Sequence, residues 1–277
     1  MGKLEMIINL NECTGCALCQ IACKDEHVGN SYLPWTKPQP DTGHFWIKVN
    51  PIERGQIPKV KVTYVPLLCV HCDNAPCMKA CPEGAISKRD DGTVWINPDT
   101  CTGSRLCQDA CPYNVIYFNT ELNIAQKCTW CMHLTEKGGI PRCVDVCPRD
   151  ALIFGDEDSP ILKELKSKAE ILNPEYEAKP RTYYIGLPKP FVAGTVIDHT
   201  TNEVNIGVKV TAIDLFNDEQ HAVFTDEFGD FQIKDLKRDH KYAVSVEKDN
   251  YEKRTIVITA DKDRNLGDIH LKKISQA

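Results

Sequence analysis

Cysteines are the residues of this chain that are best suited to do chemistry. The chain has 277 residues and 15 cysteines, all of them between Cys13 and Cys147. They form four groups: Cys13, Cys16, Cys19 and Cys23; Cys69, Cys72, Cys77 and Cys81; Cys101, Cys107 and Cys111; and Cys128, Cys131, Cys143 and Cys147. The last three groups end in C-x3-C-P, and the first, second and fourth groups begin with C-x2-C. We interpret the four groups as an internal repeat.

The third group has one member fewer than the others. The first group has the spacing C-x2-C-x2-C-x3-C, and the same spacing counted from Cys101 predicts a cysteine at position 104. The sequence has Ser104 there, while the flanking spacing is kept. One position of a ligand set is therefore replaced by an oxygen-bearing side chain.

The spacing favours iron–sulfur clusters. Three cysteines at short gaps can direct their sulfurs to three corners of one cubane cluster, and the cysteine before the proline ligates the other cluster of a pair. Four groups predict two such pairs and up to four clusters. Structural zinc uses two separate C-x2-C pairs and needs neither the third cysteine nor the C-x3-C-P ending. The odd cysteine count and an expected cytoplasmic location argue against disulfides.

Composition excludes several other classes of protein. Lysine and arginine total 33 and aspartate and glutamate 39, a net charge of −6, which argues against binding to nucleic acid. No stretch approaches the roughly 18 consecutive apolar residues of a membrane-spanning helix. The N-terminal segment is typical of a strand that leads into the first cysteine group and lacks the features of a signal peptide. We therefore expect a cytoplasmic protein without a membrane segment.

The rest of the chain divides into a connector and a β-rich region. Short β-type segments at 45–49, 59–65, 93–96 and 115–118 separate the cysteine groups. Apolar residues at helical spacing predict a helix over 161–172, and a proline-rich connector follows. From residue 191 onward, short alternating segments between turns predict a β-sandwich or barrel of roughly 85 residues. The predicted class is α+β, with a cluster-binding region at 1–155, a connector at 156–190 and a β-sandwich at 191–277.

The cysteine motifs resemble a known family. They are CTGCALCQIAC at 13–23, CVHCDNAPCMKACPEGAI at 69–86, CTGSRLCQDACPYNVI at 101–116, AQKCTWCMHL at 125–134 and PRCVDVCPRDAL at 141–152. Together they resemble the iron–sulfur subunit of molybdopterin oxidoreductases of the dimethyl sulfoxide reductase type. The resemblance implies two interleaved bacterial-ferredoxin-like units, in which groups one and four pair and groups two and three pair.

The same resemblance implies the ligand sets. Cluster 1 is held by Cys13, Cys16, Cys19 and Cys147; cluster 2 by Cys128, Cys131, Cys143 and Cys23; cluster 3 by Cys69, Cys72, Cys77 and Cys111; and cluster 4 by Cys101, Cys107, Cys81 and Ser104. The first three are complete 4Fe–4S sets. For the fourth, three outcomes stay open: an alkoxide of Ser104 holds the fourth iron, a 3Fe–4S cluster forms on three thiolates, or the cluster is absent.

The β-rich region carries a second resemblance. VAGTVID at 192–198, VKVTA at 208–212, FTDEFGDFQI at 224–233 and YAVSVEKDNY at 242–251 resemble carboxypeptidase-regulatory-like or transthyretin-like domains. A cluster region followed by this domain resembles the small subunits of the pyrogallol–phloroglucinol transhydroxylases and related anaerobic hydroxylases of resorcinol-type phenols. The resemblance implies a heterodimer in which a large subunit alone holds the molybdopterin guanine dinucleotide cofactor.

The sequence thus predicts an electron-transfer subunit without a catalytic site of its own. It relays electrons to or from the molybdenum site of the large subunit. Alternatives are a free-standing polyferredoxin, and an interaction module whose clusters are structural. Among residues beside the cysteines, His71 is more typical of a structural histidine than of a ligand. Lys24, Arg105 and Lys127 either raise the potential of a nearby cluster or belong to the solvated surface.

Overall fold

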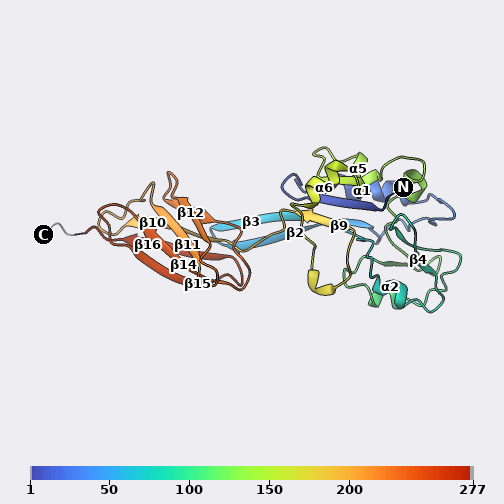
Figure 1. Ribbon diagram of the computed structural model, residues 1–277. Coiled ribbons are helices and arrows are strands. Elements are labelled where there is room, and N and C mark those ends of the chain that lie inside the picture. Colours follow the sequence, from blue (N-terminus) through green and yellow to red (C-terminus); the bar gives the residue numbers. More distant parts are fainter. Residues whose placement is uncertain (1, 275–277) are drawn as a thin grey trace. The chain divides into compact units, whose positions relative to one another are not determined.

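The computed structural model describes residues 2–274 and consists of two compact units (Figure 1). The cysteine-rich unit comprises Met1–Ile52 and Tyr64–Leu187, and the sandwich unit comprises Glu53–Thr63 and Pro188–Ala277. This grouping differs in two places from the boundaries expected at 155 and 190. Residues 53–63 belong to the sandwich unit, and residues 156–187 belong to the cysteine-rich unit.

A three-stranded sheet brings distant parts of the cysteine-rich unit together. Strand β1 (Leu4–Asn9) lies in its centre, antiparallel to β8 (Leu152–Asp156) and parallel to β9 (Thr182–Ile185). β1 has three consecutive fully buried residues, Met6, Ile7 and Ile8, so both faces of the strand are covered. The region expected to be a connector therefore contributes a strand to the same sheet as the N-terminus.

Two short hairpins follow the second and third cysteine groups. β4 (Ile86–Lys88) pairs with β5 (Val94–Ile96), and β6 (Tyr117–Asn119) pairs with β7 (Ile124–Gln126). The cysteine loops lead into short helices, α1 (Leu18–His27), α2 (Pro76–Lys79), α3 (Leu106–Asp109), α4 (Met132–Thr135) and α5 (Arg142–Asp145). The two hairpins occupy corresponding places in successive repeats.

The helix after the fourth group is shorter than the sequence predicts. α6 spans Pro160–Lys166, and a 3₁₀ turn follows at Pro174–Tyr176. Beyond α6, the Glu170 N–H donates to the carbonyl oxygen of Tyr184 in β9 at 2.7 Å. The Tyr184 N–H donates to the carbonyl oxygen of Glu170 at 2.8 Å. This bridge to β9 takes the chain out of the helical conformation before residue 172.

The sandwich unit has seven strands in two sheets. One sheet has the order β13-β10-β16 and the other β12-β11-β14-β15. The strands are β10 (Val192–Asp198), β11 (Lys209–Asp214), β12 (Gln220–Phe224), β13 (Asp230–Ile233), β14 (Lys241–Glu247), β15 (Arg254–Thr259) and β16 (Arg264–Leu271). Buried residues of both sheets, such as Val196 and Val244, form one apolar cluster. Alternating apolar residues predict this arrangement because successive side chains point to opposite faces of a strand.

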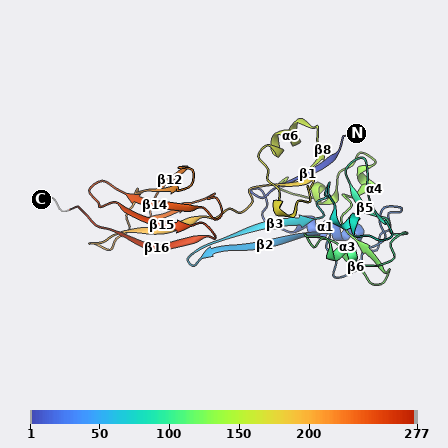
Figure 2. The same cartoon turned by 60° about the horizontal axis from the view of Figure 1, so that its bottom comes forward.

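A long hairpin contributes to both units. β2 (Ile47–Gln56) and β3 (Lys59–Leu68) lie side by side in Figure 2, and their tip belongs to the sandwich unit. At the tip, Lys59 forms an ion pair with Asp230, and Arg54 pairs with Asp263 at 3.3 Å. The sequence predicts strands at 45–49 and 59–65, and the hairpin is longer because the sandwich unit supplies partners for its tip.

Candidate metal centres

All four cysteine groups share one backbone feature. The residue before the second ligand position has a positive φ in each group: Gly15 (73°), His71 (47°), Gly103 (81°) and Trp130 (52°). A left-handed residue turns the chain tightly, which lets cysteines on both sides of it face one space. Glycine adopts this conformation freely, whereas a large aromatic residue rarely does. His71 and Trp130 are held there by burial, with 0% and 1% of their surface exposed.

A second turn repeats after each C-x3-C-P sequence. The third residue after the last cysteine of the second, third and fourth groups has a positive φ, and its N–H donates to the carbonyl oxygen of that cysteine. The pairs are Gly84 with Cys81, Asn114 with Cys111, and Asp150 with Cys147. The turn reverses the chain beyond the ligand position. The repeat seen in the cysteine spacing is therefore a repeat of loop structure as well.

Two cavities have the same construction. One is lined by Cys13, Cys16, Cys19 and Cys147. The other is lined by Cys69, Cys72, Cys77 and Cys111. Each combines three cysteines of one group with the last cysteine of another and with the proline that follows it. These are two of the ligand sets that the family resemblance implies.

The other two sets also lie together. Electrostatic interactions connect Cys23 and Cys143 with each other and with Cys128 and Cys131. Cys107 interacts in the same way with Cys101 and Cys81. The structure thus brings the cysteines of each predicted set into one neighbourhood, and their assignment as ligands stays a prediction.

Ser104 occupies the same kind of loop as Cys16. The residues around Cys16, Gly15 and Ala17, have φ values of 73° and 60°, and those around Ser104, Gly103 and Arg105, have 81° and 64°. Both central residues are exposed. The loop has kept its ligand-presenting backbone although the thiol has been replaced.

The thiol sets fit a metal cluster electrostatically. Burial, together with the neighbouring Cys13 and Cys147, raises the pKa of Cys19 to about 12. Burial likewise raises the pKa of Cys77 to about 12 and that of Cys131 to about 11. Crowded thiolates in a poorly solvated site repel one another. A positively charged metal group removes this obstacle, because thiols bind metals as thiolates.

Each of the two cavities is surrounded by four thiols that come from two cysteine groups. Within residues 2–274, no group of three or more histidine, cysteine, aspartate or glutamate side chains converges on the position of one metal ion. The four thiols around each cavity fit a multi-atom cluster.

Backbone N–H groups point at several of the sulfurs. Ala151 donates to Cys147 Sγ at 3.3 Å, Trp130 to Cys128 Sγ at 3.3 Å, and Ala125 to Cys101 Sγ at 3.4 Å. Such bonds stabilise negative charge on thiolates and thereby influence the reduction potential of a bound cluster. The donors belong to the turns and hairpins of the repeat, so the loop structure positions both sulfurs and donors.

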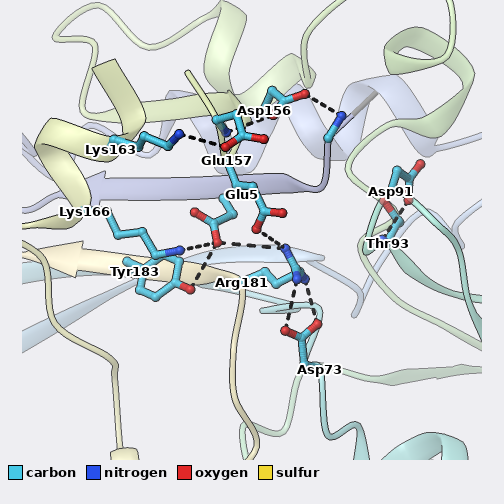
Figure 3. A network of polar contacts seen from close by, with 12 residues as sticks. Glu5, Asp73, Asp91, Thr93, Asp156, Glu157, Lys163, Lys166, Arg181 and Tyr183 are labelled. Atoms are coloured by element: carbon cyan, nitrogen blue, oxygen red, sulfur yellow. Dashed lines mark hydrogen bonds and ion pairs between the residues drawn. The ribbon is translucent and has the colours of Figure 1, made fainter. Parts of the chain in front are cut away.

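A buried arginine forms hydrogen bonds with the second cysteine loop. The sequence does not predict this contact. Arg181 donates to both carboxylate oxygens of Asp73, at 2.7 and 3.1 Å, and to Glu157 at 3.3 Å (Figure 3). Asp73 follows Cys72 directly, and the Arg181 backbone N–H donates to the carbonyl of Val70 at 2.8 Å. Glu5 also faces this guanidinium, at 3.9 Å. Residues 73 and 181 are too far apart in the chain for any local pattern to indicate the pair.

The residues beside the cysteines differ in their surroundings. His71 Nδ1 accepts from the Val94 N–H at 3.0 Å, and Arg105 lies exposed over the Phe118 ring. Lys24, partly exposed, donates to the Pro40 carbonyl. Lys127 is 2% exposed. Of the three cations considered from the sequence, Lys127 is the buried one, so the surface interpretation is wrong for it.

Comparison with known proteins agrees with this division of the chain. Residues 60–157 match the 4Fe-4S dicluster domain family, and residues 192–272 match the carboxypeptidase regulatory-like domain family. The expected carboxypeptidase-regulatory-like character of the C-terminal region is thereby confirmed. Within the part of the chain that the structure describes, no helix has the length and apolar character needed to cross a membrane.

Three curated relatives show the family. The chain is 34% identical to the pyrogallol hydroxytransferase small subunit of Pelobacter acidigallici, over 98% of this chain and 100% of that protein. It is 33% identical to the arsenate respiratory reductase iron-sulfur subunit of Shewanella sp. (strain ANA-3), over 66% of this chain and 96% of that one. It is 35% identical to a subunit of the tetrathionate reductase of Salmonella typhimurium, over 69% and 75%. The chain belongs to the iron–sulfur electron-transfer subunits of the molybdopterin oxidoreductases.

Proposed function

We propose that this chain relays electrons, through four iron–sulfur clusters, for a large molybdopterin subunit that acts on polyhydroxylated aromatic compounds. The observation that carries the substrate class is the extent of the matches. The pyrogallol hydroxytransferase small subunit matches over its full length, including the sandwich unit, whereas the arsenate and tetrathionate relatives match about two thirds of this chain. The sandwich unit is thus a feature that this chain shares with the aromatic-hydroxylating relative.

The proposed ligand sets are those given above for clusters 1 to 4. When bound, such clusters accept and release single electrons at potentials that their surroundings set. The chain supplies the thiolates and keeps water away from them. Trp130 and Tyr113 lie beside cysteine loops, with 1% and 5% of their surface exposed. A low local dielectric around the sulfurs is one way in which a protein sets cluster potentials.

Exposure of the cysteines indicates which cluster sets lie at the ends of the relay. All eight cysteines of sets 2 and 3 are buried. Set 1 includes the exposed Cys16, and set 4 includes the half-buried Cys81 and Cys101 and the exposed Ser104. Electron transfer between proteins requires close approach, so sets 1 and 4 are the ends where electrons enter and leave. Sets 2 and 3 are the interior of the relay.

The kept loop backbone around Ser104 supports an occupied fourth site. Iron analysis separates the three outcomes: about 16 iron atoms per chain for four cubane clusters, about 15 with a 3Fe–4S cluster, and about 12 when set 4 is empty. The variant Ser104→Cys restores a complete cysteine set. It adds iron if the site lacked any, and it converts a 3Fe–4S signal into a 4Fe–4S signal if three thiolates held the cluster.

The experiment that tests the function is anaerobic purification of the complex from its native host through a tag on this chain. Iron, molybdenum and tungsten are measured per chain, and co-purifying polypeptides are identified by mass spectrometry. The complex is then assayed with pyrogallol and, separately, with arsenate and tetrathionate. We expect a large subunit with molybdenum or tungsten. Of the three compounds assayed, we expect the complex to convert only pyrogallol.

Two results would contradict the proposal. Iron on a chain that purifies alone indicates the free-standing polyferredoxin. A complex that reduces arsenate or tetrathionate and leaves pyrogallol unchanged overturns the substrate class while leaving the electron-transfer role intact. The cytoplasmic location stays a prediction, which fractionation of the same cells tests.

A further inference from the structure

Lys127 is a buried cation without a carboxylate partner. It directly precedes Cys128 and has 2% of its surface exposed. Its Nζ donates to the carbonyl oxygen of Val94 and, at 3.2 Å, to that of Cys128. Among the residues that the structure describes, both hydrogen-bond acceptors of this ammonium are carbonyl oxygens, and no aspartate or glutamate forms an ion pair with it.

A lysine in this position needs an explanation. Moving an ammonium group out of water is costly, so lysines are almost never fully buried unless a negative group compensates them. Two carbonyl oxygens satisfy hydrogen bonds but carry no net charge. The compensating negative charge must therefore come from something else in the neighbourhood of Lys127.

Two of the proposed cluster sets face this lysine. Val94, whose carbonyl accepts from Lys127, lines the cavity of Cys69, Cys72, Cys77 and Cys111. The ammonium also interacts electrostatically with Cys77 and Cys111 of that set. On the other side, it interacts with Cys128 of set 2 and binds that residue's carbonyl. Lys127 thus lies at the junction of the two buried sets.

The same junction holds two aromatic rings. His71, in the loop of set 3, packs against Trp130, in the loop of set 2, with 3.9 Å between the ring centroids and 31° between the ring planes. Because His71 Nδ1 accepts a hydrogen bond from the Val94 N–H, its proton is on Nε2 and the ring is neutral. His71 Nε2 and Trp130 Nε1 are buried and have no partner within the described chain. The cation at the junction is therefore Lys127.

We propose that Lys127 is a shared counter-cation of the two buried cluster sites and raises the reduction potential of both. The inference rests on the proposed ligand sets 2 and 3. Thiolate-ligated clusters carry negative charge that grows by one on reduction, and a nearby buried cation stabilises the reduced form. Because one charge lies beside both sites, its removal lowers the potentials of both clusters.

The test is an EPR-monitored redox titration of the purified complex with the variant Lys127→Met, which keeps an apolar chain of similar length and removes the charge. We expect two clusters to become harder to reduce, each with an about tenfold lower ratio of reduced to oxidised form at a fixed potential, about 59 mV for a one-electron couple. The other clusters keep their potentials. Lys127→Arg keeps the charge and should titrate like the native protein.

A matched control removes a lysine at the surface. Lys79 lies two residues after Cys77, is exposed, and donates to Asn74 Oδ1 at 2.5 Å. Lys79→Met also removes one positive charge near set 3, but water screens that charge. We expect no resolved change in potential for Lys79→Met. A shift equal to that of Lys127→Met would show that net charge matters and the buried position does not.

The outcomes distinguish a failure of the Lys127 inference from a failure of the proposed ligand sets 2 and 3. Full iron content with unshifted potentials in Lys127→Met, or a shift of one cluster only, overturns the shared counter-cation. If Lys127→Met loses iron, Lys127→Arg decides: retained iron and native potentials support the charge, and loss of iron in both variants overturns it in favour of a steric role. A native complex without clusters at sets 2 and 3 refutes the ligand sets instead.

Discussion

The cores of the two units are made of different residues. The core of the sandwich unit consists of valine, isoleucine, leucine, alanine and aromatic side chains, among them Val210, Phe231 and Tyr242. In the cysteine-rich unit, nine core residues are cysteines, among them Cys23 and Cys143. The cysteine-rich unit also has few long elements, since four of its six helices have only four residues.

This difference implies two sources of stability. Apolar burial is the main source of stability of the sandwich unit, as in an ordinary small β-domain. The thiols of the cysteine-rich unit stabilise it mainly through the groups that they bind, because metal binding to a site that exists only in the folded chain is itself folding free energy. Changes to metal content and changes to apolar packing should therefore affect different units.

Removal of iron has the largest expected effect. We expect anaerobic chelation to unfold the loops of the cysteine-rich unit while residues 192–272 stay folded. Hydrogen exchange followed by mass spectrometry measures this directly: peptides from 69–147 lose protection, and peptides from the sandwich strands keep it. Equal loss of protection in both sets of peptides would show that the units do not differ in this respect.

Arg181→Met should have the next largest effect. It removes three charge-assisted hydrogen bonds of a buried guanidinium, two to Asp73 and one to Glu157, and their loss costs about 4 kcal/mol. Asp73 keeps its ion pair with Lys88, and Glu5 keeps its ion pair with Lys166. Denaturant titration followed by cluster absorbance measures the loss. The control Arg149→Met removes an exposed arginine paired with Glu12 and should cost less than about 1 kcal/mol.

Leu236→Ala tests the sandwich core. Leu236 is fully buried, and truncating a buried leucine costs about 3 kcal/mol through lost burial and the resulting cavity. We expect lower protection of the sandwich strands and an unchanged iron content. Leu215→Ala, at a position that is 53% exposed, is the control and should change neither. Loss of iron in Leu236→Ala would contradict independent stabilisation of the units.

The smallest expected effect concerns acid stability of the sandwich unit. The Asp198 carboxylate accepts from the Tyr251 hydroxyl at 2.6 Å and from the backbone N–H groups of Thr200 and Thr201, and these bonds hold its pKa well below the usual range. The resulting stability is present above the unfolded-state pKa of about 3.9 and is lost as the pH falls toward the folded-state value.

Asp198→Asn should therefore reduce protection of sandwich peptides at pH 6 and flatten the decline that the native chain shows below about pH 4. Hydrogen exchange at both pH values measures it, and Asp249→Asn, in an exposed turn, serves as the control. An unchanged acid profile in Asp198→Asn would assign the decline to other carboxylates.

The sequence predicts the local parts of this molecule well. In each predicted set, three of the four ligand positions belong to one cysteine group, so the spacing within the groups shows both the loops and the replacement at Ser104. Alternation of apolar residues likewise predicts the β-strands of the sandwich unit. The family and the carboxypeptidase-regulatory-like region are confirmed.

Local sequence patterns do not predict contacts between residues that are far apart in the chain. Nothing around Arg181 or Asp73 indicates that they pair, and Lys127 has the same local pattern whether it lies on the surface or between two thiol sets. The end of α6 at Lys166 and the pairing of β9 with β1 depend on hydrogen bonds that form only after the chain has folded. The contacts of these residues can be determined only from the tertiary structure.

The β2–β3 hairpin has a consequence for synthesis of the chain. Its tip at residues 53–63 belongs to the sandwich unit, whose remaining residues begin only at 188. At the usual 5–20 residues per second, Lys59 and Arg54 are synthesised roughly 9–40 s before their partners Asp230 and Asp263. During that interval Arg54 and Lys59 have no acidic partner from this unit. Completion of the sandwich unit is therefore the event that ends the hairpin's exposure in the nascent chain.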